Sequence, residues 1–175
     1  YRTGEGRPYD PDTALELLQK AAELDDVDAQ FELAQFRLDG PADVRDEARA
    51  AFWMGRAARQ GHVGAQVRYG ILRFNGRGVD PNEPEAADWF ERAATSGNPV
   101  AMNRLARVYA YGRGRDVDLE KAAGWHLAAR GLGVSDLQLD GILAGLDPDA
   151  LAAAEAFAKD YVADPTAAPE GGPIP

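Results

Sequence analysis

Three kinds of feature in this chain could support chemistry by their residue types and spacing. They are two glycine–arginine–glycine motifs, two histidines and many carboxylates. The motifs at 76–78 and 112–114 have the glycine content of loops that hold phosphate groups. A phosphate loop needs a strand before it and the start of a helix after it. Here a helical pattern precedes each motif, and the motif recurs after 36 residues. We therefore interpret both motifs as structural turns.

Metal binding and acid–base catalysis are also disfavoured. His62 and His126 are the only histidines, and the chain has no cysteine, so no set of ligands has the spacing of a zinc site. Asp and Glu number 29, but helix starts and solvated faces account for them. A hydrolase with paired carboxylates needs a cleft that no motif indicates. We expect no catalytic residue, no cofactor and no metal.

Charge and hydropathy exclude two further classes of partner. The net charge is −10, so the surface repels the phosphates of nucleic acids and of anionic membranes. No apolar run approaches the roughly 18 residues of a membrane-spanning helix. Hydrophobic residues form 45% of the chain, which is enough for a core. The expected partner is another protein or peptide, with no nucleic acid and no direct membrane insertion.

A repeat of 36 residues organises most of the chain. Residues of one type recur in a single register: Trp53, Trp89 and Trp125; Ala29, Ala65 and Ala101; Gly40, Gly76 and Gly112; Gly61, Gly97 and Gly133. A period between about 20 and 50 residues is typical of a solenoid, whose units bury their apolar faces only against neighbours. The predicted fold class is all-α, a solenoid of 36-residue helix pairs.

Each unit is predicted to contain two helices. The first helices are expected over 27–39, 62–75 and 98–111. Each ends at a glycine that takes the left-handed conformation, namely Gly40, Gly76 and Gly112. The second helices are expected over 11–24, 47–60, 83–96 and 119–130. An Asp or Asn side chain caps the first turn of each second helix, from Asp10, Asp46, Asn82 and Asp118.

The register decays after Gly133. A degenerate first helix is expected over 136–146, followed by an alanine-rich helix over 148–161. One face of that last helix is apolar and the other polar, as in a terminal cap. We assign residues 1–146 to the repeat solenoid, 147–162 to the capping helix and 163–175 to a disordered, proline-rich tail.

The repeated motif resembles the Sel-one-like repeat, a branch of the tetratricopeptide superfamily. Its clearest unit comprises Ala101, Leu105, Ala106, Tyr109, Gly112 and Gly114, then Ala122, Trp125, Ala129 and Gly133. The resemblance covers about residues 1–133, with Arg37 and Arg73 at the family's tyrosine position. It implies a right-handed superhelix, a non-enzymatic adaptor role in a bacterium, and the periplasm or cell envelope in preference to the cytoplasm.

The first residues also keep the register. Tyr1, Gly4 and Gly6 match the residue types found three repeat lengths later. Residue 1 is therefore expected to lie inside a unit of a longer solenoid that is truncated here. On that expectation, the helix over 11–24 has no first helix beside it, and its apolar stripe is bare.

In tetratricopeptide-like repeats, the first helices form the concave face. The resemblance places nine residues on this face, and we call them the inner strip: Phe31, Gln35, Leu38, Val67, Ile71, Phe74, Asn103, Arg107 and Tyr111. Their apolar members favour binding of an apolar or amphipathic peptide. The competing interpretation is that neighbouring first helices cover one another at these positions.

The expected function is therefore a protein-interaction scaffold that binds a peptide or a partner helix in its concave groove. One alternative is a structural subunit of a larger assembly, attached through the end or the convex face of the solenoid. A more remote alternative is a small-molecule binder or a hydrolase.

Overall fold

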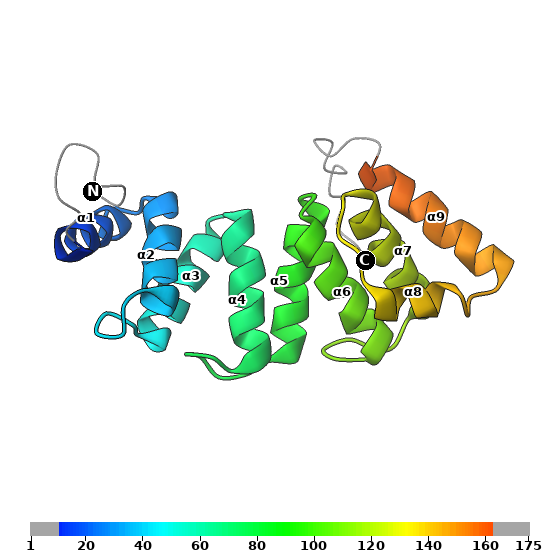
Figure 1. The fold of residues 1–175 in the computed structure, drawn as a ribbon, viewed down its shortest axis with the longest axis horizontal. Helices are drawn as coiled ribbons and strands as arrows, with labels where there is room; N and C mark the ends of the chain where they lie inside the picture. The colour runs from blue at the N-terminus through cyan, green and yellow to red at the C-terminus, as the bar shows by residue number, and fades with distance from the viewer. Residues whose placement is uncertain (1–10, 163–175) are drawn as a thin grey trace. The chain divides into compact units, whose positions relative to one another are not determined.

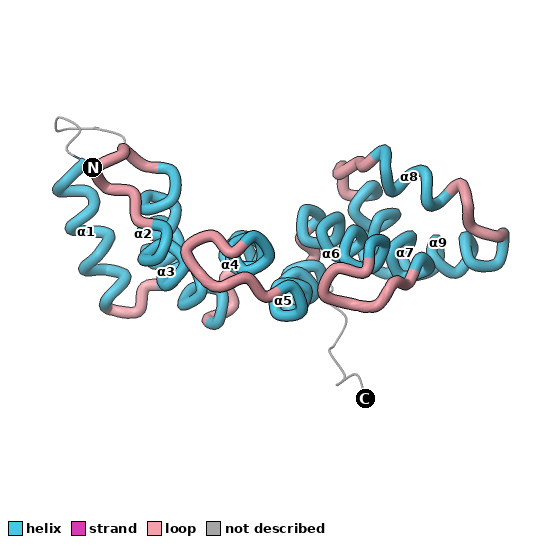
Figure 2. The backbone as a smooth tube through the Cα atoms, turned by 90° about the horizontal axis from the view of Figure 1, so that it is seen from below, coloured by secondary structure: helices cyan, strands magenta, loops and turns pink. Residues whose placement is uncertain are grey.

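The computed structural model of this chain describes residues 11–162. It divides into two compact units, Tyr1–Pro81 and Asn82–Pro175, and each is described by itself. The described residues form nine α-helices and no strand (Figures 1 and 2), which confirms the all-α class. The expected cap at Asp10 and the expected disordered tail over 163–175 lie outside the described residues.

The first unit is a series of four helices, each packed on the next. They are α1 (Pro11–Glu23), α2 (Val27–Asp39), α3 (Glu47–Arg59) and α4 (Val63–Asn75). A cluster of Ala22, Ala29 and Leu33 joins α1 to α2, and the half-buried Trp53 of α3 packs against it. Small side chains at the contacts allow the helices to approach closely, and the tryptophan fills the remaining volume.

The second unit continues the pattern and adds a final helix. Its helices are α5 (Glu83–Thr95), α6 (Pro99–Tyr111), α7 (Leu119–Gly131), α8 (Leu137–Leu143) and α9 (Pro148–Val162). Helix α9 packs against α7, where the ring of Phe157 lies over Gly124 and contacts Trp125 edge-on at 5.0 Å between centroids. Ala154 and Ala158 are buried on the same face of α9, as the predicted apolar stripe requires.

The helices begin where the sequence predicts. The side chains of Asp46, Asn82 and Asp118 each accept a hydrogen bond from the amide three residues later, at 2.9–3.1 Å. Each bond satisfies one of the amides that the first turn of a helix leaves without a partner. The first helices are capped in the same way by Asp26, His62 and Asn98.

The helix ends follow the prediction with one exception. Gly76 and Gly112 are left-handed, with φ of +67° in both. Gly40 is extended instead, with φ −73° and ψ −174°, so the expected left-handed residue is wrong there. Gly40 precedes Pro41, and a residue before proline is forced towards the extended region because the proline ring crowds its backbone.

Candidate functional site

The glycine–arginine–glycine motifs fold back onto the start of a second helix. Gly78 has φ +69°, and a Cβ on it would collide with the carbonyl oxygen of Glu47, the first residue of α3. Arg77 pairs with the Glu47 carboxylate at 2.6 Å. The motif at 112–114 repeats this arrangement on Glu83 of α5. Both motifs are internal clamps, as their interpretation as structural turns predicts.

His62 takes part in packing and capping. Its Nδ1 accepts a hydrogen bond from the Ala65 amide at 3.0 Å, and its ring stacks on Phe31 with 4.2 Å between centroids. Its Nε2 lies 3.7 Å from a carboxylate oxygen of Asp28. The ring therefore links the start of α4 to α2 within the first unit.

The other histidine connects two helices of the second unit. His126 is fully buried, and its Nε2 lies 2.8 Å from Oδ1 of Asp140. Arg130 donates to the same oxygen at 3.2 Å. The hydrogen bond with His126, together with Arg130, holds the pKa of Asp140 below its ordinary value. Across residues 11–162 no group of three or more His, Cys, Asp or Glu is placed to hold a metal ion.

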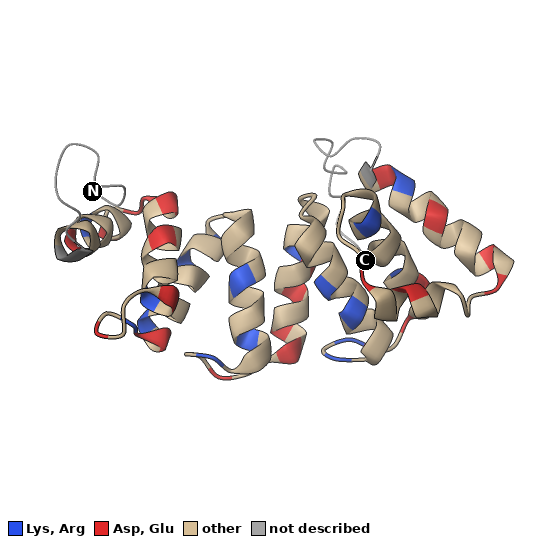
Figure 3. Cartoon of the chain, viewed as in Figure 1, with Lys and Arg blue, Asp and Glu red and all other residues tan. Residues whose placement is uncertain are grey.

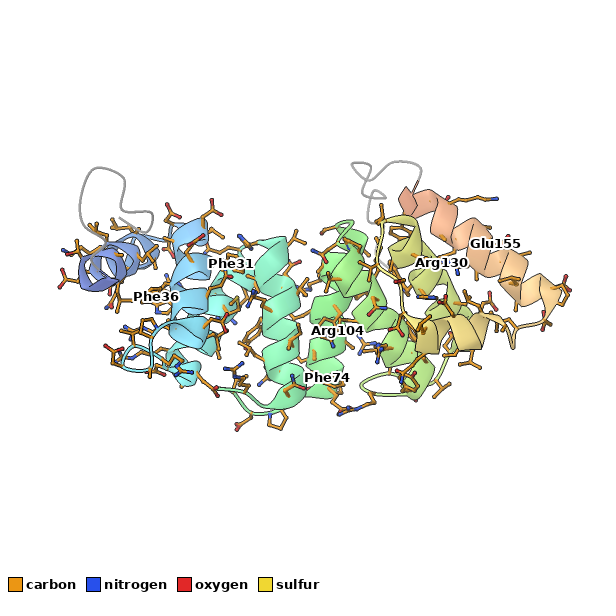
Figure 4. The ribbon with its side chains drawn as sticks, in the orientation of Figure 1. Phe31, Phe36, Phe74, Arg104, Arg130 and Glu155 are labelled. Carbon is orange, nitrogen blue, oxygen red and sulfur yellow. The ribbon has the colours of Figure 1, made fainter. Side chains whose placement is uncertain are left out.

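In the first unit, the inner strip is only partly open. Phe31, Gln35, Ile71 and Phe74 are half-buried. Figure 4 shows Phe31 on the side of α2 towards α4, and Phe74 near the end of α4. These four side chains retain some surface for a partner.

The expected exposure of two strip residues is wrong. Leu38 is 5% exposed and Val67 is 7% exposed, so neither offers a side chain to a partner. Near the starts of α2 and α4, Phe31 stacks on His62, and a Cβ on Gly64 would lie 3.4 Å from the Phe31 ring. The first helices α2 and α4 are thus in contact. For Leu38 and Val67, burial favours covering by neighbouring helices over an exposed binding surface.

In the second unit, two polar strip residues are engaged by the chain itself. Arg107 Nε donates to Asp136 at 2.7 Å and Asn103 Nδ2 donates to the same oxygen at 3.1 Å. Asp136 also caps α8, accepting from the amides of Gln138 and Leu139. Burial opposes ionisation of Asp136, but these hydrogen bonds outweigh it and lower its pKa. Helix α8 therefore occupies this part of the strip.

Tyr111, the last residue of the strip, is 49% exposed at the end of α6. The sequence analysis missed Asp136 as the partner of Asn103 and Arg107. It did place the start of a helix at residue 136, but periodicity alone does not say against which neighbour that helix packs.

An open groove lies between α1 and α2. Its volume is about 460 Å³, and it is lined by Ala14, Leu17, Leu18, Ala21, Asp26, Asp28, Ala29 and Glu32. Leu17 is 44% exposed and Leu24, at the end of the same helical stripe, is 83% exposed. The predicted bare stripe is exposed at these two leucines but not at Ala14, which is 7% exposed. Sequence reasoning did not anticipate the three carboxylates on the α2 side.

A model of one repeat family matches the chain four times. The Sel1 repeat model covers residues 1–26, 27–62, 63–98 and 99–134, in the register of the 36-residue period. Among curated proteins, none matches the chain.

Two solved structures are similar to this fold. A Sel1 repeat protein from Oxalobacter formigenes is 34% identical, with a TM-score of 0.64, over 76% of this chain and 98% of that one. A protective antigen of uropathogenic Escherichia coli with an SLR fold is 25% identical, with a TM-score of 0.65. That match covers 97% of this chain but 44% of the antigen.

No helix within residues 11–162 is long and apolar enough to cross a membrane.

Proposed function

Because the chain belongs to the Sel1 repeat family, whose repeats mediate contacts between proteins, we propose that it is a non-enzymatic scaffold. It binds a peptide or a helix of another protein along the inner strip of its first unit. The family supports the coarse function, and the inner strip supplies the candidate surface. The chemistry-bearing motifs support the same view, since the glycine–arginine–glycine motifs and the histidines are occupied in holding helices together.

One observation carries the choice of surface. Phe31, Ile71 and Phe74 retain partial exposure on α2 and α4, whereas Leu33, Leu38 and Leu72 on the same two helices are buried. Across the same two helices, Arg68 and Asp39 form an ion pair at 3.5 Å whose side chains are 44% and 62% exposed. An apolar row beside accessible charges offers both a burial surface and groups that fix the direction of a bound peptide.

A pair of matched variants tests this proposal. Phe74→Ala removes an aromatic ring from the strip, and Phe52→Ala removes one from α3, where Phe52 is 56% exposed. Partner proteins are captured with each variant and with the unmodified chain, and their dissociation constants are then measured. Phe74→Ala should weaken binding at least about tenfold, or about 1.4 kcal/mol, while Phe52→Ala should not. Equal affinities of the two variants would place the binding surface elsewhere.

The main alternative is a structural subunit that joins a larger assembly through one end. The exposed Leu17 on α1 and Leu24 just after it favour this alternative, because clustered apolar side chains on a protein surface are often covered by a partner. It predicts that Leu17→Ser disrupts an assembly that Phe74→Ala leaves intact.

A further inference from the structure

We propose that the outer face of α3 binds an acidic amphipathic helix of another protein, one whose carboxylates flank an apolar residue. The outer face comprises Arg49, Phe52, Arg56 and Arg59. These residues follow one another at intervals of three and four positions, so they lie on one side of the helix. The inner strip lies on α2 and α4, and the inference does not depend on the strip binding anything.

The outer face of α3 is open to solvent. The opposite side of the helix carries its buried residues, among them Ala50 and Met54. Phe52 is 56% exposed, and the side chain of Arg49 is 66% exposed. The ring of Phe52 meets Trp53 edge-on with 5.0 Å between centroids. The chain therefore supports this ring while more than half of the residue stays accessible.

A large apolar residue at this position of the repeat is found only on α3. The equivalent positions on the other second helices, at multiples of the 36-residue period, hold Glu16, Asp88 and Gly124. Two of these residues are charged and one has no side chain, so the repeat fold does not need an aromatic ring here. An exposed aromatic ring among arginines is instead typical of the centre of a protein interface.

The charge of the outer face is opposite to that of its equivalents. It carries three arginines and no carboxylate, within a chain whose net charge is −10. The matching positions of α1 and α5 include four carboxylates, namely Glu16, Glu23, Glu85 and Asp88. Figure 3 shows basic positions on α3 and acidic ones along the first turns of α2. An acidic ligand is thus attracted to this face and repelled by the equivalent ones.

Carboxylates of the chain engage two of the three arginines. Arg49 pairs with Asp46 at 3.3 Å, and Arg56 pairs with Asp25 at 2.5 Å. Both pairs are partly exposed, so replacing one carboxylate by another costs little. Arg59 is exposed and has no ion-pair partner among the residues that the structure describes. Arg59 is therefore the arginine most available to a carboxylate of a ligand.

The second unit shows that a helix can pack on this side of a second helix. Gly124 of α7 lies two repeat lengths after Phe52. Helix α9 packs on α7, and its Phe157 ring lies on Gly124. On α7 the aromatic ring comes from the covering helix, whereas on α3 it comes from the face itself. The best match for the α3 face is thus a helix that presents an aliphatic residue to Phe52.

A nucleic acid is a poorer occupant than an acidic helix. Its affinity grows with the number of phosphates that the protein neutralises. The outer face offers three arginines within about 15 Å of helix, and two of them already have carboxylate partners. The chemistry of the face therefore favours a short acidic segment of a protein.

Three synthetic peptides and the whole chain provide the test. Each peptide is a helix of about 14 residues, roughly 21 Å long. The first presents one leucine flanked by glutamates, the second replaces the glutamates by lysines, and the third replaces the leucine by serine. We expect the first peptide to bind, and the other two to bind at least about tenfold more weakly. Raising the salt concentration should weaken the first peptide, because exposed charges are screened.

Variants of the chain locate the binding surface. Arg59→Glu should weaken the first peptide at least about tenfold. Arg104→Glu is the matched control, because it makes the same charge change at an exposed arginine of α6 that also lacks an ion-pair partner in the described part of the chain. Phe52→Ala should abolish the difference between the leucine and serine peptides, because the leucine then has no ring to cover. Circular dichroism confirms that each variant is folded.

Failure of the first peptide to bind, or equal binding of the glutamate and lysine peptides, would overturn the inference. Equal effects of Arg59→Glu and Arg104→Glu would do the same. A thymidine oligonucleotide that binds more tightly than the first peptide, and that Arg59→Glu releases, would identify a nucleic acid as the occupant. Self-association of the chain that Arg59→Glu abolishes would identify a second copy, and either result would also overturn the inference.

Discussion

At the scale of single residues, glycine is required where two backbones touch. Gly114 has φ +88°, and a Cβ on it would collide with the carbonyl of Glu83. The loop can reach the start of α5 only because this residue has no side chain. The salt bridge between Arg113 and Glu83 then holds the loop in place.

Gly114→Ala should therefore destabilise the chain by about 2–3 kcal/mol, through backbone strain and the steric clash. Gly141→Ala is the control, because a Cβ there meets nothing within 4 Å. In helix α8 the control should stabilise by up to about 1 kcal/mol. Urea melts measure both changes in the free energy of unfolding. If Gly114→Ala costs no more than an ordinary surface substitution, the close contact between Gly114 and Glu83 is not required for stability.

The recurring tryptophan makes its largest contribution through burial. Trp89 is 7% exposed, as the repeat register predicts, and Arg92 lies over its ring at 5.0 Å. Trp89→Ala should cost about 3–5 kcal/mol, the usual range for deleting a large buried aromatic. Phe52→Ala, at an exposed position, should change the free energy of unfolding by less than about 1 kcal/mol. Similar midpoints for both variants in urea would show that Trp89 contributes little.

At the scale of helices, the start of the short helix α8 is held to α6 by the carboxylate of Asp136. Asp136 is 6% exposed in its side chain, caps α8 and accepts hydrogen bonds from Arg107 and Asn103 on α6. The attachment is electrostatic as well as geometric, so it depends on the ionised form of Asp136.

The pKa of Asp136 is lowered from its ordinary value of 3.8. A lowered carboxyl pKa stabilises the folded state above the unfolded pKa, and this stability is lost as the pH falls towards the folded pKa. Asp136→Asn should cost about 1–2 kcal/mol at neutral pH and should lose less stability on acidification below about pH 4. Urea melts at several pH values measure this. If the variant and the unmodified chain lose stability equally on acidification, Asp136 is not the titrating group.

The helices of this chain could be predicted from its sequence more fully than the exposure of its surface residues. The helix pairs were predictable because caps, glycines and apolar spacing act within a few residues. The predicted left-handed conformation of Gly40 was wrong because the proline that follows forces Gly40 towards the extended region. The corresponding glycines of the other repeats have no proline after them. The strip was harder to predict, since the burial of Leu38 and Val67 depends on packing between helices that are separate in the sequence.

At the scale of the whole molecule, the final helix protects an aromatic surface. Trp125 is 5% exposed, and Phe157 and Tyr161 of α9 lie 5.0 and 4.8 Å from it. Terminal helices with one polar face keep repeat proteins soluble because they cover the last apolar face. The outward face of α9 carries Glu155, Lys159 and Asp160, all exposed.

A chain that ends at Leu146 should therefore associate more strongly than one that ends at Val162. The shorter chain loses α9 and uncovers Trp125, while the longer one retains every described helix. Analytical ultracentrifugation at several concentrations measures the difference. If the two chains sediment alike and melt at the same temperature, α9 does not protect the end of the second unit.

The clamps also bear on how the chain folds during its synthesis. The bonds from Arg77 to Glu47, from Arg113 to Glu83 and from Gln60 to Gln30 each join residues 30 positions apart. No such contact has to wait for a distant part of the polypeptide. Ribosomes add about 5–20 residues per second, so a repeat can complete its polar contacts within seconds of leaving the exit tunnel. Nascent chains are thus expected to acquire structure one repeat at a time.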